Sequence, residues 1–189
     1  MRYPAGYKEE RRKELLKTSG EVIKNNGFSA TGVDALMAAS GVTSGAFYSN
    51  FSSKNELLKA LVESELTGLR GIWQKNPHTE ADAWLDFELD RYLSASHVQR
   101  PANGCMVPAI GAEIGRAGDD IKAIFERESR KCVDILSAKL GSEALAWAFI
   151  SQMVGTVLMA RAMPTEAAQQ EVLDAGKKFL KAAVQSIRQ

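Results

Sequence analysis

The stretch that decides the fold of this 189-residue chain covers residues 27–57 and reads GFSATGVDALMAASGVTSGAFYSNFSSKNEL. It predicts two short helices, one that follows Thr31 and ends at Gly41, and one from Ser44 to about Asn50. Two short helices joined at a glycine turn form a helix-turn-helix, whose second helix enters the major groove of DNA. We therefore expect a DNA-binding head, and the alternative is a similar helical corner with no DNA role.

The second helix of this pair carries two kinds of side chain. Phe47 and Phe51 stand one helical turn apart, so both are expected to anchor the helix in the core of the head. The other positions face outward. Their small side chains let the backbone approach base edges, and their hydroxyl and amide groups offer hydrogen bonds to phosphates or bases. These outward residues are Ser44, Gly45, Ala46, Tyr48, Ser49 and Asn50.

Helical periodicity continues along the rest of the chain, and strand patterns are nearly absent. Ser53, followed three residues later by Glu56, is typical of a capping box at a helix start. We expect an all-α chain of nine helices: one ending at Gly27, the two short helices, and six more over about 54–74, 79–97, 106–116, 119–140, 142–162 and 165–187. Residues 1–53 form the expected head, 54–74 a linking helix, and 74–189 the body.

The head resembles that of the TetR family of transcriptional regulators. The matching positions are Gly27-Phe28, Thr31, Val33, Gly41-Val42-Thr43, Gly45-Ala46-Phe47-Tyr48, Asn50-Phe51, Lys54 and Leu57-Leu58. The resemblance covers about 45 residues. It implies a TetR-like fold whose body binds a ligand and forms a homodimer through the helices at about 142–162 and 165–187. It also implies a regulator, most often a repressor, that binds a palindromic operator in double-stranded DNA and is released by a small-molecule or electrophile inducer.

The resemblance also assigns roles within the head. Contacts to phosphates would come from Tyr48, Asn50 and Lys54, and Thr31 would present its hydroxyl to the DNA backbone. Base edges would lie nearest to Thr43, Ser44, Ala46 and Ser49. Two positions depart from the family pattern, because Gly32 stands where Ser or Thr is usual and Asn50 where His or Tyr is more frequent. Both departures leave the operator sequence open.

Charge is unevenly distributed along the chain. Residues 1–60 carry nine Lys/Arg and six Asp/Glu and the remainder fifteen and seventeen, although the formal net charge is only +1. A mildly basic head suits a DNA-binding end on a regulatory body. The recognition helix contains no arginine, so the bidentate Arg–guanine contact is absent there. Either Arg2, Lys8, Arg11 and Arg12 supply positive charge to the DNA, or they form an ordinary solvated helix face.

A ligand cavity is expected among the helices of the body, and its default ligand is an apolar or aromatic small molecule. The candidate lining residues are Trp84, Phe87, Glu88, Cys105, Met106, Phe125, Trp147 and Met153. Aromatic and Met residues at helical spacing are equally typical of a core. Cys105 stands at the expected start of the helix at 106–116, where a thiol can have a lowered pKa and react with electrophiles or oxidants. A half-buried small side chain without a sensing role is the alternative.

The sequence contains no recognisable set of catalytic residues. The glycine-rich residues 111–118 lack the Lys-Ser/Thr of a phosphate loop, and His78 and His97 lack metal-ligand spacing. We expect no enzyme activity, no metal and no cofactor. No apolar run approaches the ~20 residues of a membrane span, and no signal-peptide pattern opens the chain, so we expect a cytoplasmic protein without a membrane partner. The alternative to a regulator is a helical ligand-binding or interaction protein without specific DNA binding.

Overall fold

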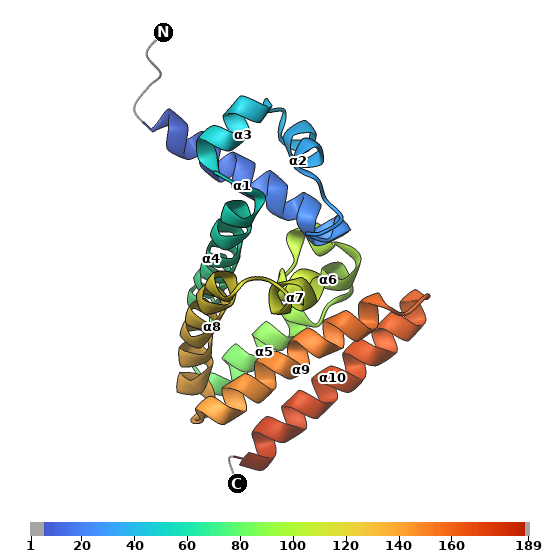
Figure 1. Cartoon of the computed structure of the whole chain (residues 1–189). Coiled ribbons are helices and arrows are strands. Elements are labelled where there is room, and N and C mark those ends of the chain that lie inside the picture. The colour runs from blue at the N-terminus through green and yellow to red at the C-terminus, as the bar shows by residue number, and fades with distance from the viewer. Residues whose placement is uncertain (1–5, 188–189) are drawn as a thin grey trace.

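A computed structural model describes residues 6–187, and within that range the chain forms α-helices and a single 3₁₀ turn, with no strand. Figure 1 shows the first three helices gathered at one end of the molecule and a long pair of C-terminal helices on the opposite side. The expected all-α class is confirmed. Most helices begin and end at the capping residues and glycines that the sequence pattern indicated.

The head contains α1 (Tyr7–Asn26), α2 (Val33–Ser40) and α3 (Ser44–Asn50). Gly41 closes α2 with φ 60°, a left-handed conformation that suits glycine. Thr43 begins α3, because its side-chain oxygen accepts the backbone N–H of Ala46. Phe47 and Phe51 are 0% and 2% exposed, as the spacing predicted. Their burial fixes which side of α3 remains in solvent.

The linking helix α4 (Lys54–Gln74) begins at Ser53, whose side chain accepts the backbone N–H of Glu56. It leaves the head and runs beside α8 (Asp119–Leu140) along one side of the body (Figure 1). Its inner face is apolar, with Leu57, Leu58 and Leu61 almost completely buried. The helix therefore belongs to the cores of both the head and the body, and it connects the two.

The rest of the body consists of α5 (Ala81–Tyr92), α6 (Ala95–Gln99), η1 (Pro101–Asn103), α7 (Val107–Gly115), α9 (Glu143–Arg161) and α10 (Glu166–Ile187). The expectation of one helix over 79–97 is wrong, because the helix ends at Leu93 and a new one begins. Ser94 takes extended backbone angles and accepts the N–H of His97, which is the signature of a helix start. The break turns the chain so that residues 94–106 pack beside α1.

The pair α9–α10 leaves apolar side chains in solvent. Leu158 and Met159 of α9 are 53% and 54% exposed, and Phe179 of α10 is 60% exposed. By length and composition alone, α9 is long and apolar enough to cross a membrane. Its most apolar 18 residues have a mean hydropathy of 1.4, and 33% of this stretch is buried. The expectation concerned an uninterrupted apolar run, and Ser151 and Gln152 interrupt the apolar residues of α9. The helix packs against α8 and α10, as a core helix of a folded body does.

Candidate nucleic-acid interface and effector cavities

The outward side of α3 forms an exposed surface at the end of the head. Thr43, Ser44, Gly45 and Ser49 are exposed, Ala46 and Asn50 are half-buried, and Tyr48 is 55% exposed. The Tyr48 ring packs edge-on against Phe47 with 5.3 Å between centroids, so the buried phenylalanine positions the exposed tyrosine. Its hydroxyl makes no hydrogen bond to the described part of the chain and points from a rigid base.

Several polar side chains of this surface already bond within α3. Ser49 Oγ and Asn50 Nδ2 both donate to the Ala46 carbonyl, at 2.9 and 2.7 Å. The Asn50 amide nitrogen also donates to Ser49 Oγ at 3.4 Å, so the capacity that remains is the Asn50 Oδ1 acceptor and the second lone pair of the Ser49 hydroxyl. The local bonds fix both side chains close to the helix, so they can touch only a partner that approaches α3 closely.

Thr31 does not belong to this surface. It is 2% exposed, and its hydroxyl donates to the Gly27 carbonyl at 2.6 Å. The start of α2 is Gly32, which has no side chain to cap the helix. The expected contact of the Thr31 hydroxyl with the DNA backbone is therefore wrong: the group closes the loop between α1 and α2 instead.

Lys54 lies at the start of α4, half-buried against the same loop. Its ammonium group donates to the Phe28 carbonyl and lies 4.2 Å from the centroid of the Phe28 ring. Burial lowers the pKa of Lys54, and the nearby Glu113 carboxylate opposes that shift. A phosphate contact would require this ammonium group to reach outward from Phe28 while it stays near the positive end of the α4 dipole.

The basic residues of α1 do not share one role. Arg12 stacks over the Phe51 ring at 4.1 Å and donates to the Asn50 carbonyl, so it fastens α1 to the carboxyl end of α3. Arg11 pairs with Glu14 at 3.0 Å along the helix, and Lys8 is exposed. Arg2 lies outside the described residues. Arg12 thus stabilises the recognition helix, which the sequence pattern did not indicate.

A carboxylate of the body binds the head. Glu113 of α7 accepts the backbone N–H groups of Phe28 and Ser29 at 2.8 and 2.6 Å. Burial alone would raise the pKa of Glu113, but these bonds favour the charged form and the net shift is downward. Residues 84 and 85 positions apart meet here, and no local sequence signal marks the pair. The contact fixes the loop that precedes the helix-turn-helix.

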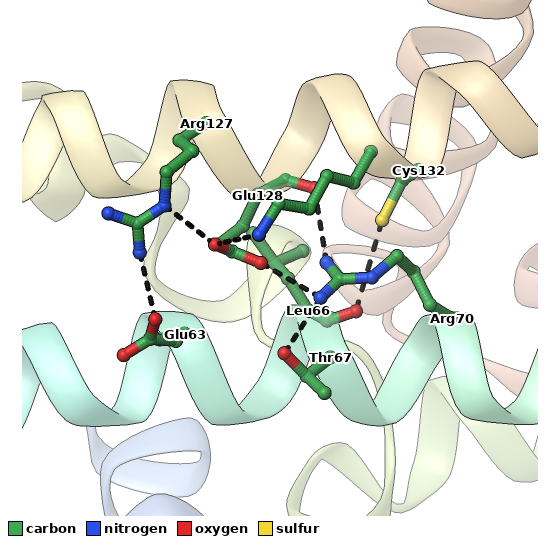
Figure 2. A network of polar contacts seen from close by, with 8 residues as sticks. Glu63, Leu66, Thr67, Arg70, Arg127, Glu128 and Cys132 are labelled. Carbon is green, nitrogen blue, oxygen red and sulfur yellow. Dashed lines mark hydrogen bonds and ion pairs between the residues drawn. The ribbon is translucent and has the colours of Figure 1, made fainter.

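Figure 2 shows a second junction, between α4 and α8. The Glu128 carboxylate is 1% exposed and pairs with Arg70 at 2.9 Å, with Arg127 at 2.8 Å and with Lys131 at 2.8 Å. Although burial by itself would raise the pKa of Glu128, bonds from these three cations lower it to about 2. Arg127 also reaches Glu63 at 2.8 Å, so the network joins α4 and α8 at two points.

Two cavities adjoin the linking helix. The apolar cavity has a volume of about 200 Å³ and lies among α4, α7, α8 and α9. Four of the expected pocket residues line it: Cys105, Phe125, Trp147 and Met153. The basic cavity, about 640 Å³, lies between α1, α4 and residues 91–106, and Cys105 and Met106 line its wall. Tyr92, Leu66, Leu69 and Cys105 belong to the walls of both cavities.

Three other expected pocket residues lie on neither cavity. Trp84 is 3% exposed and packs edge-on against Trp73, with 6.0 Å between centroids, so it is a core residue. Phe87 is 40% exposed and lies beside His78 on the surface. The Glu88 carboxylate is buried and satisfied by Arg91 at 2.6 Å and by Asn76 at 2.9 Å. Their helical spacing reflects packing, as the alternative interpretation held.

The expected low pKa of Cys105 is also wrong. Cys105 lies two residues before α7 begins, and burial raises the pKa of its thiol above the usual value. Its backbone N–H donates to His97 Nε2 at 2.9 Å, while His97 Nδ1 bonds the Tyr92 carbonyl at 2.6 Å. Burial is the main cause that lowers the pKa of His97 to about 4, so the ring is neutral and accepts through Nε2.

Gly104 lets these groups meet. A Cβ at this position would lie 2.3 Å from His97 Cδ2 and 3.0 Å from Arg161 Nη2. Arg161 donates to the His97 carbonyl at 2.9 Å, and Lys24 donates to the Gly104 carbonyl at 3.1 Å. A side chain would separate the loop from both α9 and α1, so a glycine is required at position 104.

Comparisons with known proteins agree with this architecture. Residues 15–61 match the family described as "Bacterial regulatory proteins, tetR family". The chain is 28% identical over 171 residues to the transcriptional regulator AcuR of Cereibacter sphaeroides, which covers 78% of this chain and 74% of the relative. It is 24% identical over 136 residues to the transcriptional repressor NemR of Escherichia coli, covering 68% and 66%.

Solved structures show the same fold. A TetR-family regulator from Agrobacterium tumefaciens superposes with a TM-score of 0.77 at 15% identity, over 91% of this chain and 98% of that one. The reduced form of NemR superposes with a TM-score of 0.74 at 20% identity, over 89% and 96%. The helix-turn-helix at residues 33–50 lies within the segment that matches this family, and the whole chain has the fold of TetR-family regulators. These findings support a DNA-binding transcriptional regulator.

Proposed function

We propose that this protein is a cytoplasmic repressor that binds a palindromic operator as a homodimer and leaves the DNA when a small molecule binds its body. The observation that carries the proposal is the surface of α3, where Tyr48 stands exposed on a buried phenylalanine base. Thr43, Ser44, Gly45, Ala46, Ser49 and Asn50 form the rest of the proposed contact surface. Lys54 supplies a cation at its edge.

Two heads are needed for specific binding. A single small head makes few phosphate contacts, so its binding is weak and strongly dependent on salt. The exposed Leu158, Met159 and Phe179 support dimerisation through α9 and α10, because apolar side chains of this size are stabilised when a second copy covers them. The two heads of such a dimer would bind half-sites about 34–36 Å apart, one turn of DNA.

The proposed boundaries divide the chain into a head, a linking helix and a body. Residues up to 53 form the DNA-binding head, α4 is the link, and residues from 74 onward form the body for ligand and partner. Release requires a ligand that binds the DNA-incompetent arrangement more tightly than the DNA-bound one. The apolar cavity borders α4, and α7 carries Glu113, so a ligand there adjoins both connections to the head.

The chemistry of Cys105 favours a ligand that binds without forming a covalent bond. Its side chain lines both cavities, but its raised pKa leaves little thiolate at neutral pH, and the thiolate is the reactive form. Release by an electrophile remains the second candidate, because the NemR relative is known in a reduced form. Cys105→Ser separates them: a variant that still leaves the DNA with every effective compound refutes sensing through the thiol.

Binding of the upstream region of its own gene, measured by fluorescence anisotropy with random DNA as competitor, tests the proposal. We expect specific, salt-sensitive binding, weakened about fivefold by Tyr48→Phe because one phosphate hydrogen bond is lost. Lys75→Gln is the matched control, since this exposed lysine follows the end of α4 that is farthest from the head. Binding no tighter than to random DNA would support a ligand-binding protein without specific DNA recognition.

A further inference from the structure

We propose that the basic cavity is a second binding site, separate from the apolar cavity, for a small organic anion that carries a carboxylate or phosphate group. The cavity measures about 640 Å³, within the range of ligand pockets. One wall comes from α1 of the head and the others from α4, the end of α5 and residues 94–106. An occupant would therefore touch the head and the body at once.

The charges of the wall favour an anion. Its cationic residues are Lys13, Lys17, Lys24, Arg91 and Arg100, and Glu65 is the one carboxylate among the residues that line it. Glu65 is already bound to Lys24 at 3.0 Å, and Arg91 is bound to Glu88. Lys13, Lys17 and Arg100 pair with no carboxylate of the described residues. Three uncompensated cations around a concave surface concentrate positive potential inside it.

A buried donor points to the position of the anionic group. Tyr92 is 3% exposed and lines the cavity, yet its hydroxyl has no hydrogen-bond partner. The group nearest to this hydroxyl is the Cys105 thiol, which is only a weak hydrogen-bonding group. Buried polar atoms are nearly always paired, so an oxygen of a ligand in this cavity would supply an acceptor for the Tyr92 hydroxyl.

The arrangement has a regulatory consequence, which rests on the proposed function. Three of the five cations lie on α1 of the head, and the other two, Arg91 and Arg100, lie in the body after α4. An anion bound between them draws α1 toward the body and fixes the position of the head relative to α4. Its occupancy is therefore expected to change DNA affinity through α1, which does not line the apolar cavity.

The test is isothermal titration calorimetry of the full-length protein, without DNA, using 2-naphthoate and inorganic phosphate as probes. 2-Naphthamide is the matched neutral compound, with the same rings and no charge. We expect the carboxylate to bind about tenfold more tightly than the amide, because charge-assisted hydrogen bonds are the stronger kind. Tyr92→Phe should weaken binding of the carboxylate and leave the fold intact, because the buried ring is kept and only its hydroxyl is removed.

The double variant Lys17→Gln with Arg100→Gln should reduce naphthoate affinity by about tenfold or more, since two of the free cations are lost. Both side chains are exposed, so the variant keeps its fold, and Lys75→Gln is the control for a cation outside the cavity. Equal binding of naphthoate and naphthamide, no loss in the double variant, or no binding of either anion at millimolar concentration would each overturn the proposal. Because no DNA is present, these results are independent of whether the protein is a repressor.

Discussion

Replacing Glu128 by glutamine tests whether charge or shape joins the linking helix to the body. Glutamine has the shape of a protonated glutamate, so the variant removes the charge that Arg70, Arg127 and Lys131 surround. The pKa of Glu128 is about 2 in the folded protein, against an ordinary value of 4.5. At ~1.4 kcal/mol for each tenfold change in a binding constant, the ionised carboxylate contributes about 3 kcal/mol to the free energy of unfolding at pH 7.

The sign of the pH dependence follows from the direction of the shift. A lowered folded pKa means that the unfolded chain takes up the proton first as the pH falls. The contribution of Glu128 is complete above its unfolded pKa of 4.5 and is lost as the pH falls toward its folded pKa of about 2. At pH 3 about half of it remains, roughly 1.5 kcal/mol.

Urea denaturation at pH 7, 5, 4 and 3, at one fixed protomer concentration, measures the difference between the wild type and Glu128→Gln. Glu126→Gln is the matched control, because Glu126 lies on the same helix but is 62% exposed and pairs only with Arg130 in the described chain. The control variant should lower the free energy of unfolding by less than about 0.5 kcal/mol at every pH. If Glu128→Gln lowers the free energy of unfolding as much at pH 3 as at pH 7, the charge of the carboxylate does not stabilise the junction between α4 and α8.

Three further changes probe the connections around the cavities. Glu113→Gln should lower the free energy of unfolding by about 1–2 kcal/mol and speed amide exchange at Phe28 and Ser29, measured by NMR; unchanged exchange would show that the carboxylate does not hold that loop. Gly104→Ala should lower the free energy of unfolding by about 1–3 kcal/mol, because the added methyl group overpacks the loop. The expected readout is a lower melting temperature, and an unchanged melting temperature would mean that the loop adapts to the methyl group. The ring of His97, assigned with His97→Gln, should titrate near pH 4 in an NMR series. Because the unfolded ring protonates first, near its ordinary pKa of 6.5, the protein should lose stability as the pH falls from there toward 4; a midpoint near 6.5 would contradict its burial.

Local chemistry made the head predictable from sequence. The bounds of α3, the glycine turn at Gly41 and the starts at Thr43 and Ser53 all depend on residues within four positions of one another. The alternation of buried Phe47 and exposed Tyr48 follows from helical spacing in the same way. Such signals survive in any fold that contains the segment, which is why the family resemblance and the helix-turn-helix could be inferred.

The remaining features depend on partners far along the chain. Glu113 meets the head across 84 and 85 positions, and Lys24 meets Glu65 across 41. Thr31 looked like a free hydroxyl because its partner, the Gly27 carbonyl, is a backbone atom that no residue type reveals. Cys105 precedes a helix, which favours a low pKa, but tertiary burial outweighs that local effect. Both cavities likewise exist only because α1, α4 and α7 come together.

If the Glu63–Arg127 pair nearer the head gives way, α4 could tilt with the junction at Arg70 and Glu128 as its fulcrum. From Arg70 to Lys54 the helix extends about 24 Å, at 1.5 Å per residue. A tilt of about 8° about that fulcrum moves the head by about 3.4 Å, the rise of one base pair along a strand. In a dimer the two heads would separate by up to twice that distance, and their recognition helices would lose register with successive major grooves. A change that alters packing at the fulcrum only slightly is therefore sufficient to decide whether the protein fits its operator.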